Sequence, residues 1–214
     1  MVVDVLRFTT AVEAANSAGA AVYPWRWGDP GAPERARAVG AELPSQPGRG
    51  GPALSPLLLR QRPAGSKVLL ASPNGATCSV TAAEAGATVF AACLRNAGAV
   101  AGAAAALGRP VTVVAAGERW PDGSLRPALE DLLGAGAVLA ELTRRRAGVC
   151  SPEAESAAAL FGAAASVGDL VRHCASGREM ADRGRADEVD YAVDAGASNV
   201  VPLLNEGAFR ALLP

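Results

Sequence analysis

The sequence predicts an α/β protein with three layers (α/β/α), in which helices cover both faces of a mostly parallel, mixed central sheet. Short apolar runs rich in valine and leucine alternate with alanine-rich stretches of helical period. The apolar runs are continuous, which is typical of parallel strands buried on both faces. Half of the 214 residues are hydrophobic and only 4% are aromatic, so alanine, valine and leucine must fill the core. Because we see no linker and no internal repeat, we expect a single domain over residues 1–214.

The expected strands are short apolar runs bounded by turn residues. In chain order they are residues 1–6, 20–27, 67–71, 87–93, 111–114 and 199–203. The run from Val111 to Val114 is entirely β-branched and has the composition of a buried strand. The final run, Val200-Val201-Pro202-Leu203, is expected to return to the same sheet.

The expected helices follow these strands and begin or end at recognisable capping residues. In chain order they are residues 9–17, 33–40, a short helix from Ser55-Pro56, 76–85, 97–107, 128–146, a helix from Pro152, 167–174, 179–183 and 186–193. Thr9 and Thr10 are suited to cap the first helix, and Gly19 to end it. Glycine and proline are frequent in residues 42–56, which predicts a loop. From about residue 150 onwards the chain is expected to be rich in helix.

Composition limits the possible partners and the compartment. The net charge is −1, which argues against nucleic acid or an anionic membrane surface as the main partner. No apolar run approaches the ~20 residues of a membrane helix, and the first residues lack the pattern of a signal peptide. The four cysteines are scattered, which favours reduced thiols in a cytoplasmic protein. His173 is the only histidine, so a zinc site is not expected.

The densest polar stretch covers residues 115–131, between the fifth expected strand and a helix. It carries two arginines and four carboxylates, which belong to Glu118, Asp122, Glu130 and Asp131. One interpretation is metal and phosphate chemistry at the carboxyl end of a strand. The alternative is a solvated hairpin tip followed by the charged first turn of a helix, where acidic residues favour the helix dipole.

Polar side chains also follow other strands, and ligands of open α/β sheets bind at the carboxyl ends of the strands. The pairs at these ends are Asp4 with Arg7, Ser72 with Asn74, Arg95 with Asn96, and Glu118 with Arg119. Arginines suit an anionic ligand, carboxylates from separate strands suit Mg²⁺, and the helix that begins after Asn74-Gly75 offers free N–H groups. Each pair could instead be a structural strand-end pair or a turn.

Several phosphoryl and nucleotide chemistries are excluded by their missing motifs. The chain contains no GxxxxGK[ST] loop, no GxSxG elbow and no GxGxxG after a strand. Asp4 at a strand end is reminiscent of an aspartyl-phosphate nucleophile, but the second aspartate of that pattern is replaced by Leu6. A metal-assisted hydrolase without a histidine base remains open.

Six segments in register resemble the 2-phosphosulfolactate phosphatase (ComB-like) family over nearly the whole chain. They are residues 3–10 (VDVLRFTT), 72–75 (SPNG), 95–96 (RN), 116–118 (AGE), 129–136 (LEDLLGAG) and 200–202 (VVP). The resemblance implies a three-layer α/β/α fold, a homodimer, and Mg²⁺-dependent removal of phosphate from a small phosphorylated sulfonate, 2-phosphosulfolactate. That reaction belongs to the route to coenzyme M.

The resemblance also implies roles for individual side chains at the motif positions. The expected catalytic residues are Asp4, Glu118 and Asp131, and the expected metal ligands are Asp4, Glu118 and Glu130. The expected substrate-binding residues are Arg7, Asn74, Gly75, Arg95, Asn96 and Arg178. The division between metal and substrate rests on charge. Asp122 and Arg126 are expected to be hairpin-tip residues.

The loop after the second strand departs from the family's pattern. The family usually carries Gly-Glu-Arg ahead of Gly-Phe-Asp-x-Gly-Asn-Ser-Pro. Here residues 41–43 are Ala-Glu-Leu and residues 49–56 are Arg-Gly-Gly-Pro-Ala-Leu-Ser-Pro. The arginine, aspartate and asparagine of the pattern are thereby replaced by Leu43, Gly51 and Leu54. The alternative function is therefore a substrate-shifted or non-catalytic member that acts as an anion-binding, oligomeric module.

Overall fold

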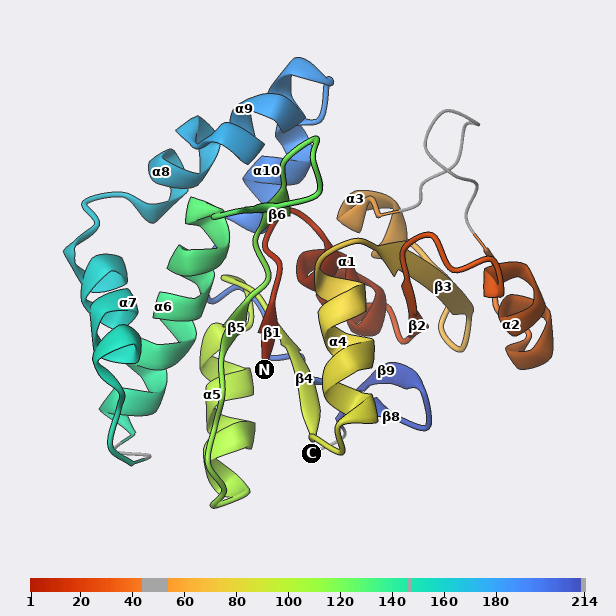
Figure 1. Cartoon of the computed structure of the whole chain (residues 1–214), viewed down its shortest axis with the longest axis horizontal. Helices are drawn as coiled ribbons and strands as arrows, with labels where there is room; N and C mark the ends of the chain where they lie inside the picture. The colour runs from red at the N-terminus through yellow and green to blue at the C-terminus, as the bar shows by residue number, and fades with distance from the viewer. Residues whose placement is uncertain (44–53, 146–147, 213–214) are drawn as a thin grey trace.

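The computed structural model describes residues 1–43, 54–145 and 148–212, and within these a seven-stranded mixed sheet forms the middle layer (Figure 1). The strand order is β3-β2-β9-β8-β4-β1-β5. The strands are β1 (Val2–Val3), β2 (Ala21–Arg26), β3 (Lys67–Ser72), β4 (Val89–Ala92), β5 (Val114–Ala115), β8 (Pro202–Asn205) and β9 (Ala208–Ala211). A separate two-stranded hairpin consists of β6 (Glu118–Arg119) and β7 (Leu125–Arg126).

The sheet is built from two parallel parts joined by an antiparallel hairpin. Strand β1 lies parallel to β4 and β5, and β2 lies parallel to β3. The β8–β9 hairpin lies between these parts and pairs antiparallel with both β4 and β2. Its two-residue turn places Glu206 and Gly207 at positive φ, as a type I′ turn requires. The expected three-layer fold with a mixed sheet is therefore confirmed.

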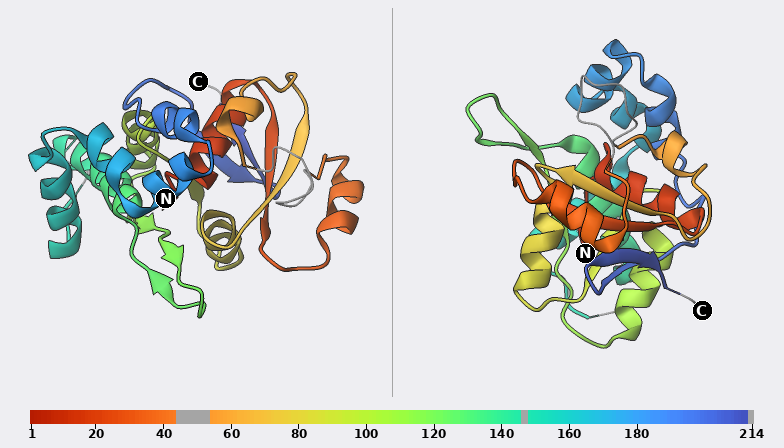
Figure 2. Two further views of the ribbon diagram at one scale, coloured as in Figure 1. Left: turned by 90° about the horizontal axis from the view of Figure 1, so that it is seen from above. Right: turned by 90° about the vertical axis from the view of Figure 1, so that its right-hand side faces the viewer.

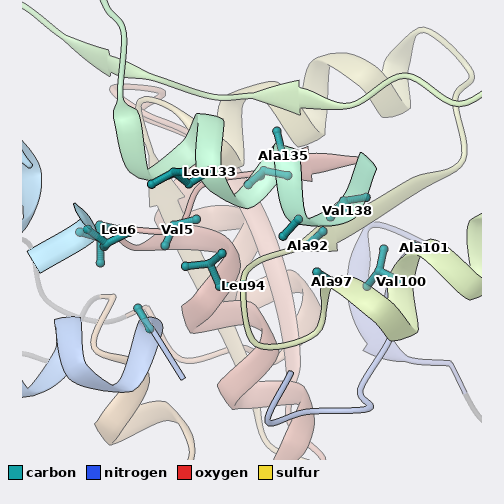
Figure 3. Close-up of a cluster of buried hydrophobic side chains, with 14 of the residues drawn as sticks. Val5, Leu6, Ala92, Leu94, Ala97, Val100, Ala101, Leu133, Ala135 and Val138 are labelled. Carbon is teal, nitrogen blue, oxygen red and sulfur yellow. The ribbon is translucent and has the colours of Figure 1, made fainter. Parts of the chain in front are cut away.

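Helices cover both faces because alternate strand residues enter different cores. Val3 packs with α5 and α6, whereas its neighbour Val2 packs with α1 and α4. Figure 3 shows the first of these cores, where Val5, Leu133 and Val138 meet residues of β4 and α5. The helices of the described residues are α1 (Phe8–Ser17), α2 (Ala32–Val39), α3 (Pro56–Leu59), α4 (Gly75–Glu84), α5 (Ala97–Ala106), α6 (Leu129–Arg144), α7 (Pro152–Ala163), α8 (Val167–His173), α9 (Ala175–Asp182) and α10 (Ala186–Ala192).

Two glycines let α6 approach its neighbours closely. A Cβ atom at Gly134 would lie 2.7 Å from Val5 and 2.8 Å from Val3, so the helix rests directly on β1. A Cβ atom at Gly136 would lie 2.3 Å from the Ala157 carbonyl oxygen of α7. Both distances are shorter than real Cβ contacts, so this part of the family-like motif has a packing function. The close contact fixes the first turn of α6 against the end of β1.

The C-terminal part is rich in helix, as expected, and it forms a cap over one end of the sheet. Helices α8, α9 and α10 lie together above the ends of β1 and α6 (Figures 1 and 2). Helix α7 begins at Pro152, as expected, and the Ser151 hydroxyl accepts the Ala154 N–H at its start. In the described part of the chain, no single helix is long and apolar enough to cross a membrane, and α7 with α8 would pass only as a pair bent by 100°.

The structure corrects the expected boundaries of two elements near the site. Strand β1 covers only Val2–Val3, because the chain turns into α1 directly after Asp4. Helix α1 begins at Phe8, so Thr9 and Thr10 lie inside it and do not cap it. Their hydroxyls instead donate to the carbonyl oxygens of Asp4 and Val5, at 2.7 Å each. The threonines therefore hold the β1–α1 turn closed.

Three further elements differ from the sequence-based expectation. The run from Val111 to Val114 is not a buried strand, since only Val114–Ala115 pairs with β1, at the exposed edge of the sheet. Helix α9 begins four residues early, at Ala175, because the Cys174 thiol accepts the Gly177 N–H. Strand β9 was missed, because it contains a single large apolar side chain, Phe209, and its turn lacks the usual Asn-Gly signal.

Candidate active site

A cleft of about 130 Å³ lies where the ends of β1 and β3 meet the hairpin and the C-terminal cap. Side chains of both signs line it, together with amide and hydroxyl groups. The lining residues are Asp4, Leu6, Arg7, Phe8, Leu54, Ser72, Pro73, Asn74, Glu118, Ser176, Glu179, Met180 and Arg183. Four of the sequence-predicted site residues, Asp4, Arg7, Asn74 and Glu118, are therefore brought together in one cleft.

The end of β3 reaches the end of β1 although five steps of the sheet separate them. Three antiparallel pairings make β2 and β3 run against β1 in the hydrogen-bond ladder. A twist of roughly 20–25° per strand turns β3 by about 100–125° across these steps, so that the two ends converge. The contact is direct, because the Gly75 N–H after β3 donates to the Asp4 carboxylate at 2.8 Å.

Asp4 lies between the N-termini of two helices. Its Oδ1 accepts the Phe8 N–H of α1 at 3.0 Å, and its Oδ2 accepts the Gly75 N–H of α4. A Cβ atom at residue 75 would lie 2.7 Å from Oδ2, so only glycine permits this approach. The sequence predicted that the Gly75 N–H binds phosphate. In the structure this N–H already donates a hydrogen bond to the Asp4 carboxylate.

The pKa of the Asp4 carboxyl lies well above the ordinary value for an aspartate. Burial raises its pKa to about 6, and the nearby carboxylates of Glu118 and Glu130 raise it further, against the two N–H donors. Asp4, Glu118, Glu130 and Asp131 form what we call the acidic cluster. Like charges converge there, and within the described residues no arginine or lysine side chain forms an ion pair with any of them, which favours either a proton or a cation.

Asp131 connects the two strand ends that carry the other acids. Its Oδ1 accepts the Val5 N–H at 2.7 Å, and its Oδ2 accepts the Gly117 N–H at 2.9 Å. Val5 follows Asp4 in the chain, and Gly117 precedes Glu118. Burial and the charges of Asp4 and Glu130 raise the pKa of Asp131 well above its ordinary value. Asp131 does not line the cleft, so its geometry is that of a residue that positions Asp4 and Glu118.

Glu130 lies behind the cleft and not in it. Its side chain is buried in the first turn of α6, and its Oε2 accepts a hydrogen bond from the Cys174 thiol at 3.2 Å. Burial raises the pKa of that thiol to about 11, so it remains a donor at neutral pH. Sequence reasoning assigned Glu130 to the metal, whereas the structure places it next to the cap.

Arg7 and Asn74 contribute polar groups from two sides of the cleft. Arg7 forms an ion pair with Glu188 of α10, and both side chains are largely buried. Asn74 precedes α4 and is 6% exposed, and its backbone N–H donates to the Ser72 hydroxyl. The peptide bond between Leu6 and Arg7 is cis. Arg7 is thus held by the cap, while the Asn74 side chain borders the cleft.

Arg95 and Asn96 are not brought to this cleft. Arg95 donates through Nε to the buried Glu13 carboxylate at 3.0 Å, stacks 3.8 Å from the Tyr191 ring centre and reaches Asp194. We call Glu13, Arg95, Tyr191 and Asp194 the paired cluster. Asn96 is fully buried, with its amide bonded to the backbone of β4 and of Val200.

Asn96 therefore closes the turn after β4 and ties it to the segment before β8. Arg95 turns toward α1 and α10 because the Glu13 carboxylate, on α1, is 1% exposed and needs a cation. The sequence shows that two polar residues follow a strand, but not whether their side chains point into the cleft. It therefore could not distinguish Arg95 and Asn96 from the pairs that do line the cleft.

Arg178 is exposed on α9 and does not line the cleft. The cap instead contributes residues that sequence reasoning missed, namely Ser176, Glu179, Arg183 and the Arg7 partner Glu188. Their only signal in the sequence was a polar helix of period near 3.6, in which Ser176, Glu179 and Arg183 recur on one face.

The departing loop lies partly outside the described residues. Gly51 belongs to residues 44–53, of which nothing is described. Leu54 lines the cleft, so the change from the family's asparagine affects the cleft wall directly. Glu42 forms a surface ion pair with Arg62, and Leu43 is exposed.

Three carboxylates line the cleft, and two of them, those of Asp4 and Glu118, form no ion pair within the described residues and are available to a cation, whereas Glu179 is paired with Arg126. Among residues 1–43, 54–145 and 148–212, no three acidic, histidine or cysteine side chains are arranged as a metal site. Mg²⁺, however, commonly takes only one or two protein carboxylates and completes its shell with water and substrate oxygens. Uncompensated acids beside an open cleft fit that ion, whereas a metal held only by protein groups would not fit.

Fold and cleft together define a three-layer α/β protein with an acidic, arginine-flanked site at the ends of its strands. The family model of 2-phosphosulpholactate phosphatase matches residues 1–207, and the chain belongs to this family. No curated protein matches the chain closely enough to count as a relative. Membership supports a function like that of a 2-phosphosulfolactate phosphatase.

Proposed function

We propose that the protein hydrolyses 2-phosphosulfolactate, or a closely similar small phosphomonoester, to the alcohol and phosphate in the cleft. The observation that carries the proposal is the convergence of Asp4, Glu118, Arg7 and Asn74, from three strand ends, on one small cavity. The family match supports the reaction type. A volume of about 130 Å³ suits a small anion better than a peptide or a nucleotide.

Asp4 and Glu118 are the residues that would hold Mg²⁺. When bound, Mg²⁺ would polarise a phosphoryl oxygen and lower the pKa of a water molecule beside it. The pKa of about 6 for Asp4 means that its proton leaves readily near neutral pH, so the carboxylate is available when a cation arrives. Two fixed N–H donors hold both of its oxygens, and binding therefore requires little rearrangement.

Arg7 and Asn74 are suited to bind and orient the phosphate. The guanidinium is a planar donor that remains charged, and it borders the cleft while Glu188 holds it in place. The amide of Asn74 and the hydroxyls of Ser72 and Ser176 offer neutral donors around the same cavity. Charge on the phosphate would thus meet fixed donors and not bulk water.

Asp131 acts through its neighbours and not on the substrate. Because it bonds the N–H groups next to Asp4 and Glu118, it sets the distance between the two carboxylates. Glu130 adds negative charge behind Asp4 and remains a less direct candidate for the metal.

A substrate-shifted or non-catalytic member is the second candidate, and one observation favours it. Leu54 places an apolar side chain in the cleft wall where the family's pattern has an asparagine. Loss of one polar group changes specificity strongly when that group pairs with substrate.

The test is phosphate release from 2-phosphosulfolactate and a panel of small phosphomonoesters, with Mg²⁺ or with a chelator. We expect Mg²⁺-dependent release that Asp4→Asn lowers by roughly 100-fold or more. Arg109→Ala, a surface substitution at the other end of the sheet, serves as the control and should keep full activity. Folded protein that releases phosphate from no compound, yet is stabilised by anions, would refute catalysis in favour of the anion-binding module.

Assembly and compartment are part of the same proposal. A homodimer is consistent with the exposed apolar side chains of the β6–β7 hairpin, which extends from the body (Figure 2) and carries Trp120 and Leu125, both more than half exposed. Light scattering of the intact protein and of Trp120→Ser decides between dimer and monomer. Four free cysteines fit a reducing cytoplasm.

A further inference from the structure

Five charged side chains of the described residues line the cleft, and two of them are arginines, of which only one forms an ion pair within the described residues. Arg7 is paired with Glu188, and Glu179 is paired with Arg126 of the hairpin. Arg183 lines the same cleft, but no carboxylate of the described residues lies within ion-pair distance of it. The remaining two charges are the carboxylates that would hold the cation.

Arg183 is held in place by backbone structure, while its guanidinium remains available. It follows the last residue of α9, and its N–H donates to the Met180 carbonyl oxygen at 3.1 Å. The Gly184 N–H donates to the carbonyl oxygen of Ala181, so the helix end is well ordered around it. An exposed arginine at a cleft rim can bind an anion without first breaking an ion pair.

The charges that line the cleft indicate what Arg183 could bind. Mg²⁺ with two carboxylates is neutral, and so is the ion pair of Arg7. Arg183 is the one charge in the described lining left over for a ligand that carries more negative charge than a phosphate alone. We propose that Arg183 binds the second anionic group, a sulfonate or carboxylate, of the phosphomonoester and thereby determines specificity for doubly anionic substrates.

This inference rests on the proposed function for its substrate, but it names a different residue from those that the sequence suggested. Arg178 lies on α9 outside the cleft lining, whereas Arg183 lies at the end of the same helix and lines the cleft. We therefore expect substitution of Arg183, and not of Arg178, to change substrate specificity. Planar, bidentate recognition of a sulfonate or carboxylate is what a guanidinium provides and an ammonium provides only in part.

The experiment compares two substrates in the full chain with Mg²⁺: 2-phosphosulfolactate, and phenyl phosphate, which has no second anion. We expect Arg183→Ala to lower kcat/KM for 2-phosphosulfolactate by roughly 10- to 100-fold and to leave phenyl phosphate unchanged. Arg183→Lys should recover part of the loss. Arg109→Ala removes the same charge at the opposite end of the sheet and controls for net charge.

Calorimetric binding of sulfolactate, which has the second anion but no phosphate, gives a readout that needs no turnover. Binding that is lost in Arg183→Ala and kept in Arg109→Ala supports the inference even if the protein hydrolyses nothing, in which case the proposed function alone fails. Equal losses for both substrates, no loss, no sulfolactate binding by the unaltered protein, or a substrate-specific loss only in Arg178→Ala would each overturn it.

Discussion

Two buried groups of charges, the acidic cluster and the paired cluster, lie at neighbouring strand ends and have opposite organisation. In the paired cluster, the Glu13 carboxylate meets the Arg95 guanidinium at 3.0 Å and the Tyr191 hydroxyl at 3.3 Å. In the acidic cluster, carboxylates face one another and backbone N–H groups, and the pKa of Asp4 rises to about 6. The paired cluster therefore stabilises the fold by itself, whereas the acidic cluster lacks a compensating charge that a ligand could supply.

The comparison teaches that burial of charge does not by itself mark a site. Arg95 is buried like Asp4 (8% and 4% exposed), but the groups around its guanidinium are carboxylates, a backbone carbonyl and a ring face. A site is indicated where burial leaves charge uncompensated beside an open cavity. Four substitutions test this distinction, from the largest expected effect to the smallest.

Breaking the paired cluster should cost the most stability. Arg95→Ala leaves the Glu13 carboxylate buried without its cation, and we expect a loss of about 3–5 kcal/mol in the free energy of unfolding. Urea unfolding measures it, with Arg144→Ala, which removes an exposed pair with Glu141, as the matched control at about 0–1 kcal/mol.

If Arg95→Ala were instead as stable as the unaltered protein and bound substrate poorly, Arg95 would belong to the site after all, as the sequence first suggested. Adding Glu13→Gln to Arg95→Ala should restore part of the stability, because the orphaned charge is then removed.

Asp131→Asn should have the next largest effect and should affect both stability and activity. An amide keeps one acceptor oxygen but presents an N–H₂ group to a backbone N–H, so one of the two bonds is lost, at about 1–3 kcal/mol. Phosphate release should fall as well, because Asp4 and Glu118 lose their common support. The control is Asp122→Asn at the exposed hairpin tip, which bonds only Ser124 and should change neither quantity by much.

The pH dependence of stability tests the uncompensated charge itself. The folded pKa of Asp4 lies above its ordinary value, so the folded state binds more protons and Asp4 makes stability fall as pH rises from about 4 to 6. The whole shift corresponds to about 3 kcal/mol. Glu118→Gln removes one of the charges responsible, and in chelator it should stabilise the protein by about 1 kcal/mol at pH 7 while making no difference near pH 4.

Thermal melts across this pH range give the comparison, and Glu84→Gln, far from the cleft, supplies the control. Added Mg²⁺ should stabilise the unaltered protein above pH 6 more than it stabilises Glu118→Gln. Melting curves of the two proteins that stay parallel at every pH would show that Glu118 does not act on Asp4.

The surface ion pair between Arg126 and Glu179 should matter least. The glutamate is 46% exposed, and pairs of this kind contribute about 0–1 kcal/mol. A double-mutant cycle with Arg126→Ala and Glu179→Gln should therefore give a small coupling energy. A coupling above 2 kcal/mol would mean that the hairpin and the cap behave as one rigid unit.

Much of the fold could be predicted because its signals are local. Most of the continuous apolar runs and the helix that starts at Pro152 lie where the sequence placed them. Strand β9 could not be predicted, since its place in the sheet depends on pairing with two distant strands. The exposed edge position of Val114 was equally invisible, because composition does not show which strand ends the sheet.

The sequence indicated which acidic residues lie in the cleft better than it indicated which arginines do. Asp4 and Glu118 follow the parallel neighbours β1 and β5, so the rule for parallel strands predicts that they meet. Asn74 reaches the same cleft only because the twist of the sheet turns the end of β3 toward β1, which the sequence does not show. Arg183 and Glu188 could not be found, because they lie on cap helices whose docking depends on tertiary contacts. Phosphate binding by Gly75 and catalysis by Asp131 remain predictions. In the structure the Gly75 N–H donates to Asp4, and the Asp131 carboxylate accepts backbone N–H groups.

The β8–β9 hairpin has a consequence for the order in which the protein assembles. Every hydrogen-bonded path in the sheet from β2 and β3 to β4, β1 and β5 passes through residues 202–211. During synthesis, the two parts of the sheet thus wait with unpaired edges until these residues have left the ribosome. Because Asp4 and Gly75 belong to different parts, the nascent chain should gain its cleft only after the β8–β9 hairpin has paired, and its need for chaperones should be greatest before that step.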